Sequence, residues 1–166
     1  ERAAARLVDK QCKSVLYVKI SERFHSVSPS SKSAYNIAVV FRSAKNNTKA
    51  AEYFAQAADL QVDVTKKAEY FYTLATTYGY ANKAKAREAA LKALELKPTM
   101  GKAHTYIAQL YANSSNDCGE NGFESKAGFW LAAESAKKAG VVEPKYKKSA
   151  DDLAEIMKVE FKIVDE

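Results

Sequence analysis

Three segments of the chain share one pattern of apolar and polar positions. In each, an aliphatic residue precedes an alanine, and an aromatic residue follows the alanine by three positions. The three pairs and their aromatic residues are Ile37-Ala38 with Phe41, Leu74-Ala75 with Tyr78, and Ile107-Ala108 with Tyr111. At helical periodicity these positions share one face. The pattern therefore predicts three helices, each of which buries the apolar side chains on that face. A fainter copy, Leu153-Ala154 with Met157, predicts a fourth.

An alanine-rich segment follows each of the first three, and its periodicity predicts a second helix. The segments are "TKAAEYFAQAADL" (48–60), "AKAREAALKALELKP" (84–98) and "KAGFWLAAESAKKAG" (126–140). Alanine lets two helix axes approach closely, so we expect small residues where the helices cross. These are Ala51, Ala55 and Ala58; Ala86, Ala90 and Ala93; and Ala132, Ala136 and Ala139.

The two ends of the chain follow the same periodicity less completely. Residues 1–27 contain no Pro or Gly and space apolar residues at helical intervals, which predicts one long helix or two nearly continuous ones. "SVSPSSKS" (26–33) breaks this segment and offers Ser to cap a helix beginning near Lys32. Pro144 is predicted to end the helix that contains residues 126–140. After it, "YKKSADDLAEIMKVEF" (146–161) is predicted to form a last helix that caps the stack of helices.

The segment "AEYFYTLATTYGYANKAKAREAALKALELKP" (68–98) resembles a tetratricopeptide repeat, whose period is about 34 residues. The resemblance implies an all-α fold, a right-handed α-solenoid of stacked antiparallel helix hairpins. It implies a single domain over 1–166, with an N-terminal helical segment, about three repeats and a capping helix. The predicted parts are 1–31, repeats 33–63, 66–98 and 99–144, and the capping helix 145–161.

The third repeat is longer than the other two. From the first-helix alanine to the last second-helix alanine, the separations are 20, 18 and 31 residues. The additional residues fall in "NSSNDCGENGFE" (113–124), which predicts a loop inserted at the turn within the repeat. Asp117, Glu120, Asn121 and Glu124 offer oxygen ligands, but Gly119 and Gly128 stand where a calcium loop needs ligands. We therefore expect a solvated surface loop and no metal site.

In proteins that this chain resembles, the first helix of every repeat lines a concave groove. The resemblance implies a peptide-binding surface formed by Lys32, Tyr35, Val39, Arg42, Glu69, Tyr72, Thr76, Tyr80, Lys102, Thr105, Gln109 and Asn113. Tyrosine offers broad, rigid contact area with a polar tip, and the cations suit an acidic segment or a terminal carboxylate. The alternative interpretation is that these residues only keep a helix face soluble. The paired Asn and Lys with which one subfamily clamps chaperone tails are absent.

The expected function is that of a noncatalytic scaffold that binds a protein or peptide in the groove, acidic segments included. The alternative is a structural piece of a larger envelope complex or longer repeat chain, with the groove unused. No paired acid and base, glycine-rich phosphate loop or His/Cys cluster predicts an enzyme or a cofactor. Cys12 and Cys118 lie in different segments, without metal-ligand spacing.

The charge and hydropathy of the chain limit the kinds of partner that we expect. The formal net charge is +6, but lysine is scattered among acidic residues, so we expect no nucleic-acid binding. No apolar run approaches the length that spans a bilayer, so we expect no direct membrane insertion. "CGENGFESKAGFWLAAESAKKA" (118–139) is similar to a pattern in repeat proteins of Bacteroidetes-type bacteria. That similarity favours a periplasmic or cell-envelope location, with a cytoplasmic one left open.

Overall fold

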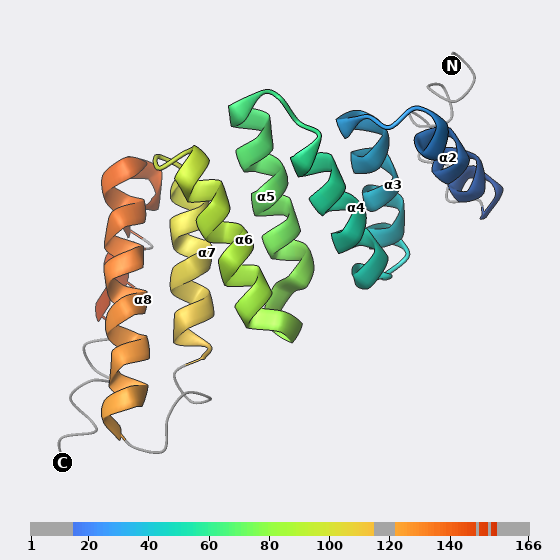
Figure 1. The fold of residues 1–166 in the computed structure, drawn as a ribbon. Helices are drawn as coiled ribbons and strands as arrows, with labels where there is room; N and C mark the ends of the chain where they lie inside the picture. Colours follow the sequence, from blue (N-terminus) through green and yellow to red (C-terminus); the bar gives the residue numbers. More distant parts are fainter. Residues whose placement is uncertain (1–14, 115–121, 149, 153, 156–166) are drawn as a thin grey trace. The chain divides into compact units, whose positions relative to one another are not determined.

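A computed structural model describes residues 15–114, 122–148, 150–152 and 154–155. The chain is all-α over these residues, as predicted, and no strand occurs among them (Figure 1). It divides after Gly79 into two compact units, and each is described by itself. The helices are α2 (Val15–Val27), α3 (Ser31–Ser43), α4 (Asn47–Asp59), α5 (Val64–Tyr78), η1 (Gly79–Asn82), α6 (Lys83–Leu96), α7 (Gly101–Ala112), α8 (Gly122–Val142) and η2 (Pro144–Tyr146).

Side-chain caps set where the helices of the first unit begin. Ser30 caps α3 in a reciprocal capping box with Ser33, which confirms a serine cap next to Lys32. Asn46 and Asp63 accept hydrogen bonds from the first turns of α4 and α5. Helices α3 and α4 form a hairpin, and α5 packs on α4.

The core of the first unit lies where α3, α4 and α5 meet. The predicted pairs Ile37-Ala38 and Leu74-Ala75 are buried, and Phe54 of α4 is the largest side chain that is fully buried. On α4 the predicted small-residue stripe is wrong at Ala55, which is only half-buried. The buried positions are instead Ala50, Ala51, Phe54, Ala57 and Ala58, because the stripe is centred on the Phe54 ring.

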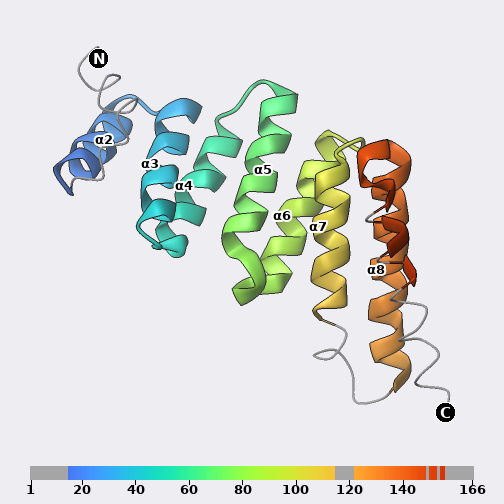
Figure 2. The same ribbon diagram turned by 180° about the vertical axis from the view of Figure 1, so that it is seen from behind.

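In the second unit α7 packs on α6 on one side and on α8 on the other (Figure 2). All six alanines predicted at helix crossings on α6 and α8 are buried, as is the pair Ile107-Ala108. After η2, which begins at Pro144, residues 147–148, 150–152 and 154–155 are helical. Ala150 from this stretch joins a buried cluster with Ala108 and Ala136, so it packs against α7 and α8.

The inserted loop is shorter than the sequence predicts. Helix α8 begins at Gly122, so residues 122–124 of the predicted loop 113–124 belong to its first turn. Asn113 is the C-cap of α7. Residues 115–121, which carry Cys118 and most of the considered metal ligands, lie outside the described residues, as does Cys12.

The division after Gly79 falls inside the predicted second repeat, 66–98, so α5 and α6 belong to different units. The predicted repeat boundaries and the single domain over 1–166 stay predictions. Within the first unit, α3 and α4 form a hairpin. Within the second unit, α7 and α8 form another.

Candidate functional site

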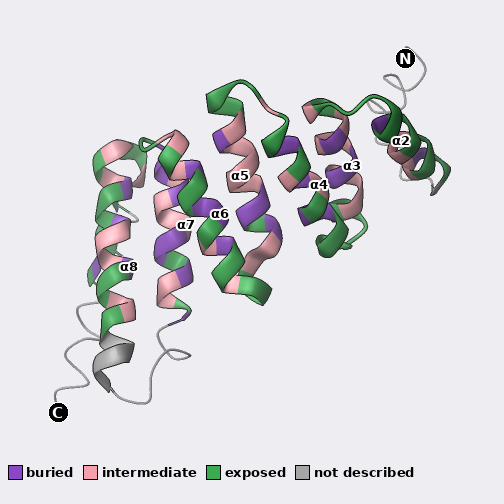
Figure 3. Ribbon diagram, in the orientation of Figure 1, coloured by how far each residue is buried: buried purple, intermediate pink, exposed green. Residues whose placement is uncertain are grey.

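The predicted binding residues of the first unit lie on α3 and α5, and we call this set the α3–α5 face. Helices α3 and α5 both carry exposed, intermediate and buried positions (Figure 3). On α3, Lys32 and Arg42 are exposed, while Tyr35 and Val39 are half-buried. On α5, Glu69 and Tyr72 are half-buried and Thr76 is exposed. The spacings of three, four and seven residues place each group on one side of its helix.

Aromatic rings from α3, α4 and α5 meet at Tyr35, one residue of the α3–α5 face. Tyr35 stacks on Tyr70 of α5, with ring centroids 4.6 Å apart. It also meets Phe54 of α4 edge-on at 5.3 Å. The Arg42 guanidinium lies 5.2 Å from the centre of the Phe54 ring. Tyr35 is therefore held in place by packing as well as being offered at the surface.

Sequence periodicity gives no sign that Tyr70 and the fully buried Phe54 hold Tyr35 in place. Tyr70 belongs to "AEYFYTL", where three aromatic residues stand within three positions, and helical periodicity alone does not say which one faces α3. Phe54 lies on a second helix of the repeat pattern, where the spaced alanines are the periodic signal. The contacts between helices decide both.

Tyr80 does not lie on the helix to which the sequence assigned it. Helix α5 ends at Tyr78, because Gly79 takes a φ of 56°, a left-handed value that an L side chain rarely adopts. Tyr80 follows in η1, is exposed, and has its ring 6.4 Å from that of Tyr106 on α7. The prediction that Tyr80 continues the row Glu69, Tyr72 and Thr76 is therefore wrong.

The other predicted residues lie on α7, in the second unit. Lys102 and Thr105 are half-buried, and Gln109 and Asn113 are exposed. The Thr105 hydroxyl donates to the Gly101 carbonyl at 3.1 Å. The Asn113 amide donates to the Gln109 carbonyl at 2.8 Å, so these two side chains are engaged with their own helix.

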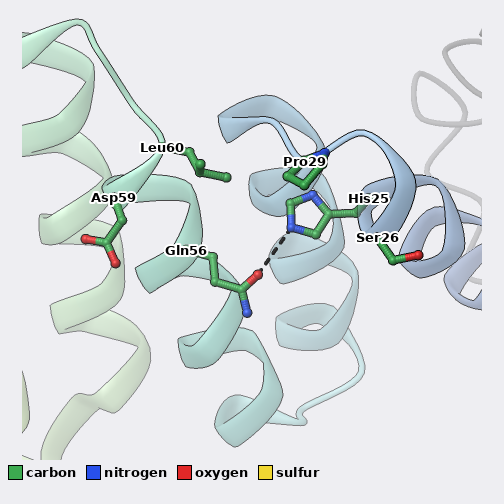
Figure 4. A pocket seen from close by; sticks show the side chains of 6 residues that line it. All are labelled: His25, Ser26, Pro29, Gln56, Asp59 and Leu60. Atoms are coloured by element: carbon green, nitrogen blue, oxygen red, sulfur yellow. Dashed lines mark hydrogen bonds between the residues drawn. The ribbon is translucent and has the colours of Figure 1, made fainter.

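A separate pocket lies in the first unit, between the C-terminal ends of α2 and α4 (Figure 4). Its volume is about 420 Å³, and it is lined by His25, Ser26, Pro29, Gln56, Asp59 and Leu60. Its position differs from that of the α3–α5 face, none of whose predicted residues lines it.

His25 connects α2 to both neighbouring helices at this pocket. Its Nδ1 is 2.6 Å from the Ser33 hydroxyl of α3, and its Nε2 is 3.2 Å from Gln56 Oε1 of α4. Its ring also meets Tyr53 edge-on at 6.1 Å. Sequence reasoning assigned His25 no setting, because its partners are 8 to 31 residues away along the chain and only the tertiary structure brings them together.

Tyr53 carries the second link between α2 and α4. Its hydroxyl donates to Glu22 Oε1 at 3.0 Å. Burial, followed by this hydrogen bond and the nearby carboxylates of Glu22 and Glu52, raises the pKa of Tyr53 to about 12. The phenol therefore stays protonated and keeps donating well above neutral pH.

The described residues contain no group of three or more His, Cys, Asp or Glu arranged to hold a metal ion. Within the same residues, no helix has the length and apolar content to cross a membrane.

Comparison with known proteins bears on the fold. No family model matches the chain, and no curated protein matches its sequence. Among solved structures, the crystal structure of MamA is similar, with a TM-score of 0.53, 13% sequence identity, and coverage of 88% of this chain and 83% of that chain. MamA is a helical protein of the tetratricopeptide-repeat type, so the predicted α-solenoid fold class is confirmed. At this identity the similarity concerns the fold alone.

Proposed function

We propose that this chain is a noncatalytic interaction module that binds an extended segment of a protein partner on the α3–α5 face. The fold class supports this, because helical-repeat proteins use the surface formed by their stacked hairpins to hold other chains. The observation that carries the proposal is the fixed ring of Tyr35, stacked on Tyr70 and flanked on α3 by the exposed cations Lys32 and Arg42.

A fixed aromatic ring suits recognition, because little side-chain freedom is lost when a partner packs on it. Tyr35 is held from two sides, at 4.6 Å by Tyr70 and at 5.3 Å by Phe54. Tyr72 on α5 is half-buried, so part of its surface remains for a ligand.

Two of the three charged residues of this face are cations, Lys32 and Arg42, against the single acid Glu69, and this balance favours an acidic segment. Lys32 and Arg42 are exposed on α3, and neither forms an ion pair with a described residue. Arg42 already stacks on the Phe54 ring, which leaves the edge of its guanidinium for a carboxylate.

A further contact surface is proposed on α7, in the second unit, and is to be tested separately. It consists of Lys102, Thr105, Gln109 and Asn113.

A peptide selection tests the proposal. Peptides of about 12 residues, the length of an extended recognition segment, are selected from a randomised library on the whole chain, and their affinities are measured by calorimetry. We expect acidic sequences to be enriched. Their affinity should fall by about tenfold or more for Tyr72→Ala and for Arg42→Gln. Lys45→Gln, an exposed cation at the turn after α3, is the matched control and should change little.

Two results would contradict the proposal. The first is selected peptides that bind Tyr72→Ala and Arg42→Gln as tightly as the wild-type chain. The second is no enrichment at all together with concentration-dependent self-association of the chain, which would favour the structural-piece alternative.

A further inference from the structure

Helix α2 leaves its apolar side facing solvent. Four apolar side chains recur along it at intervals of four, four and three residues. Their exposed fractions are 66% for Leu16, 44% for Ile20, 37% for Phe24 and 72% for Val27. An amphipathic helix at the surface of a protein ordinarily buries such a row against the core, so this exposure needs a physical reason.

The side of α2 that carries His25, opposite the row, packs on α3 and α4. Of the described side chains of α2, only His25 and Tyr17, which lies next to Phe24 around the helix, are buried. The attachment is largely polar: His25 bonds to Ser33 and Gln56, and Glu22 accepts from Tyr53. These contacts fix the rotation of α2, and the apolar row is consequently held outward.

The geometry of the exposed row fits one helix. At 100° per residue, the four side chains fall within an arc of about 80°. Eleven residues separate Leu16 from Val27, which corresponds to about 17 Å, or three turns. A narrow row of this length matches the seam of a two-helix coiled coil.

Charge specifies the chemistry of the occupant. Lys19 and Arg23 are exposed along one border of the row, and neither forms an ion pair with a described residue. Glu22, the one acidic residue of α2, lies on the packed side, where Tyr53 holds it. The exposed side of α2 therefore presents apolar side chains and two cations, with no acid of its own.

We infer that the exposed side of α2, formed by Leu16, Lys19, Ile20, Arg23, Phe24 and Val27, docks an amphipathic helix of a protein partner whose apolar row is bordered by carboxylates. A helix of this kind buries the four apolar side chains and pairs its carboxylates with Lys19 and Arg23. A membrane surface fits less well, because interfacial helices present a broad apolar face and a strongly charged opposite face, whereas here the row is narrow and the cations follow one border.

The test uses the full chain and three probes. The first is a designed helical peptide of about 18 residues with Leu at the seam positions and Glu at the flanking positions. The second is the same peptide with Lys in place of Glu, and the third is vesicles of phosphatidylcholine and phosphatidylserine. We expect the acidic peptide to bind at least about tenfold more tightly than the basic one, with an affinity that falls as salt rises.

Variants assign the binding to α2. Ile20→Ser/Phe24→Ser and Lys19→Glu/Arg23→Glu should each weaken the acidic peptide by about tenfold or more. These side chains are exposed, and circular dichroism checks that the fold is retained. Val62→Ser, which changes a 91% exposed side chain between α4 and α5, is the matched apolar control. Tyr72→Ala should also leave this affinity unchanged, so this surface and the α3–α5 face succeed or fail independently.

Four outcomes would overturn the inference. They are equal binding of the acidic and basic peptides, unchanged affinity in both α2 variants, and vesicle binding that is lost with Ile20→Ser/Phe24→Ser in the absence of peptide binding. The fourth is binding of the acidic peptide only to a chain that lacks residues 1–14, which would assign the surface to the chain's own N-terminal segment.

Discussion

At the scale of single residues, alanine determines how closely the helices approach. Ala38, Ala75 and Ala108 stand at equivalent positions of the three-segment pattern, and each is fully buried. A methyl group is the largest side chain that such a crossing accommodates without moving the backbones apart. The aromatic residue three positions later is only half-buried in all three cases. The alanines thus carry the packing, and the aromatic residues reach toward the surface.

Ala75→Leu tests this assignment. The added side chain has no space at a fully buried position, so we expect overpacking to lower the free energy of unfolding by about 1–3 kcal/mol. Urea denaturation followed by circular dichroism measures the change. Thr76→Leu, at the exposed neighbouring position, is the control and should stay within about 0.5 kcal/mol of wild type. Equal stability of the two variants would mean that Ala75 is not at a helix crossing.

Tyr53 predicts a dependence of stability on alkaline pH. Its pKa in the folded chain is about 12, against 10.0 for an unperturbed tyrosine, because burial and Glu22 disfavour the phenolate. A pKa raised by folding contributes stability that is complete below pH 10 and is lost as the pH rises toward 12. At about pH 11, we expect folded wild type and Tyr53→Phe to show the same phenolate absorbance. In urea at that pH, wild type should show one phenolate more; the same excess in the folded chain would contradict the prediction.

At the scale of elements, α7 and α8 are joined at one end by contacts that no helix propensity encodes. The Gly101 N–H, in the first turn of α7, donates to the Glu143 carboxylate at 2.9 Å. Lys145 donates to the other oxygen of that carboxylate at 2.6 Å, and the two contacts, with Lys145 the stronger cause, lower the pKa of Glu143. Tyr146 of η2 lies against Gly101, where a Cβ would come within 2.6 Å of its ring.

Gly101→Ala tests this close approach. In an open helix the change would stabilise the fold by about 0.5–1 kcal/mol, because alanine has the higher helix propensity. Here the new Cβ meets the Tyr146 ring, so we expect the chain to become less stable, by about 1–3 kcal/mol. In a Tyr146→Ala background the same substitution should be neutral or stabilising. Thermal unfolding of the four chains in this cycle measures the coupling, and strictly additive effects would contradict it.

At the scale of the whole molecule, burial is unevenly distributed. Helices α3, α4, α5, α6 and α7 each bury at least three described side chains, whereas α2 buries two, one of them a histidine. In a repeat protein each element is stabilised mainly by its immediate neighbours, so an element with few buried apolar side chains opens most readily. The proposed partner helix would cover the apolar side of this element.

Hydrogen exchange tests this distribution. We expect the backbone amides of α2 to exchange faster than those of α3 and α4, because little buried apolar surface opposes the opening of α2. Mass spectrometry of peptic fragments resolves the three helices. Saturating amounts of the acidic helical peptide should slow exchange in α2 and leave α4 nearly unchanged. Protection of α2 equal to that of α4 in the free chain would show that its polar attachment is as stabilising as the core.

The sequence by itself determined the fold class, because the signals that specify each helix lie within that helix or next to it. The pairs Ile37-Ala38, Leu74-Ala75 and Ile107-Ala108, the spaced alanines and the serine cap at Ser30 all act within a few turns of their own helix. The tertiary structure decided what depends on contacts between helices or on a single backbone angle. Gly79 ends α5 and separates Tyr80 from its predicted row, and Phe54 shifts the buried stripe of α4 away from Ala55. The partners of Tyr35, the setting of His25 and the outward rotation of α2 likewise rest on residues distant in the chain, and periodicity carries no signal for such pairs.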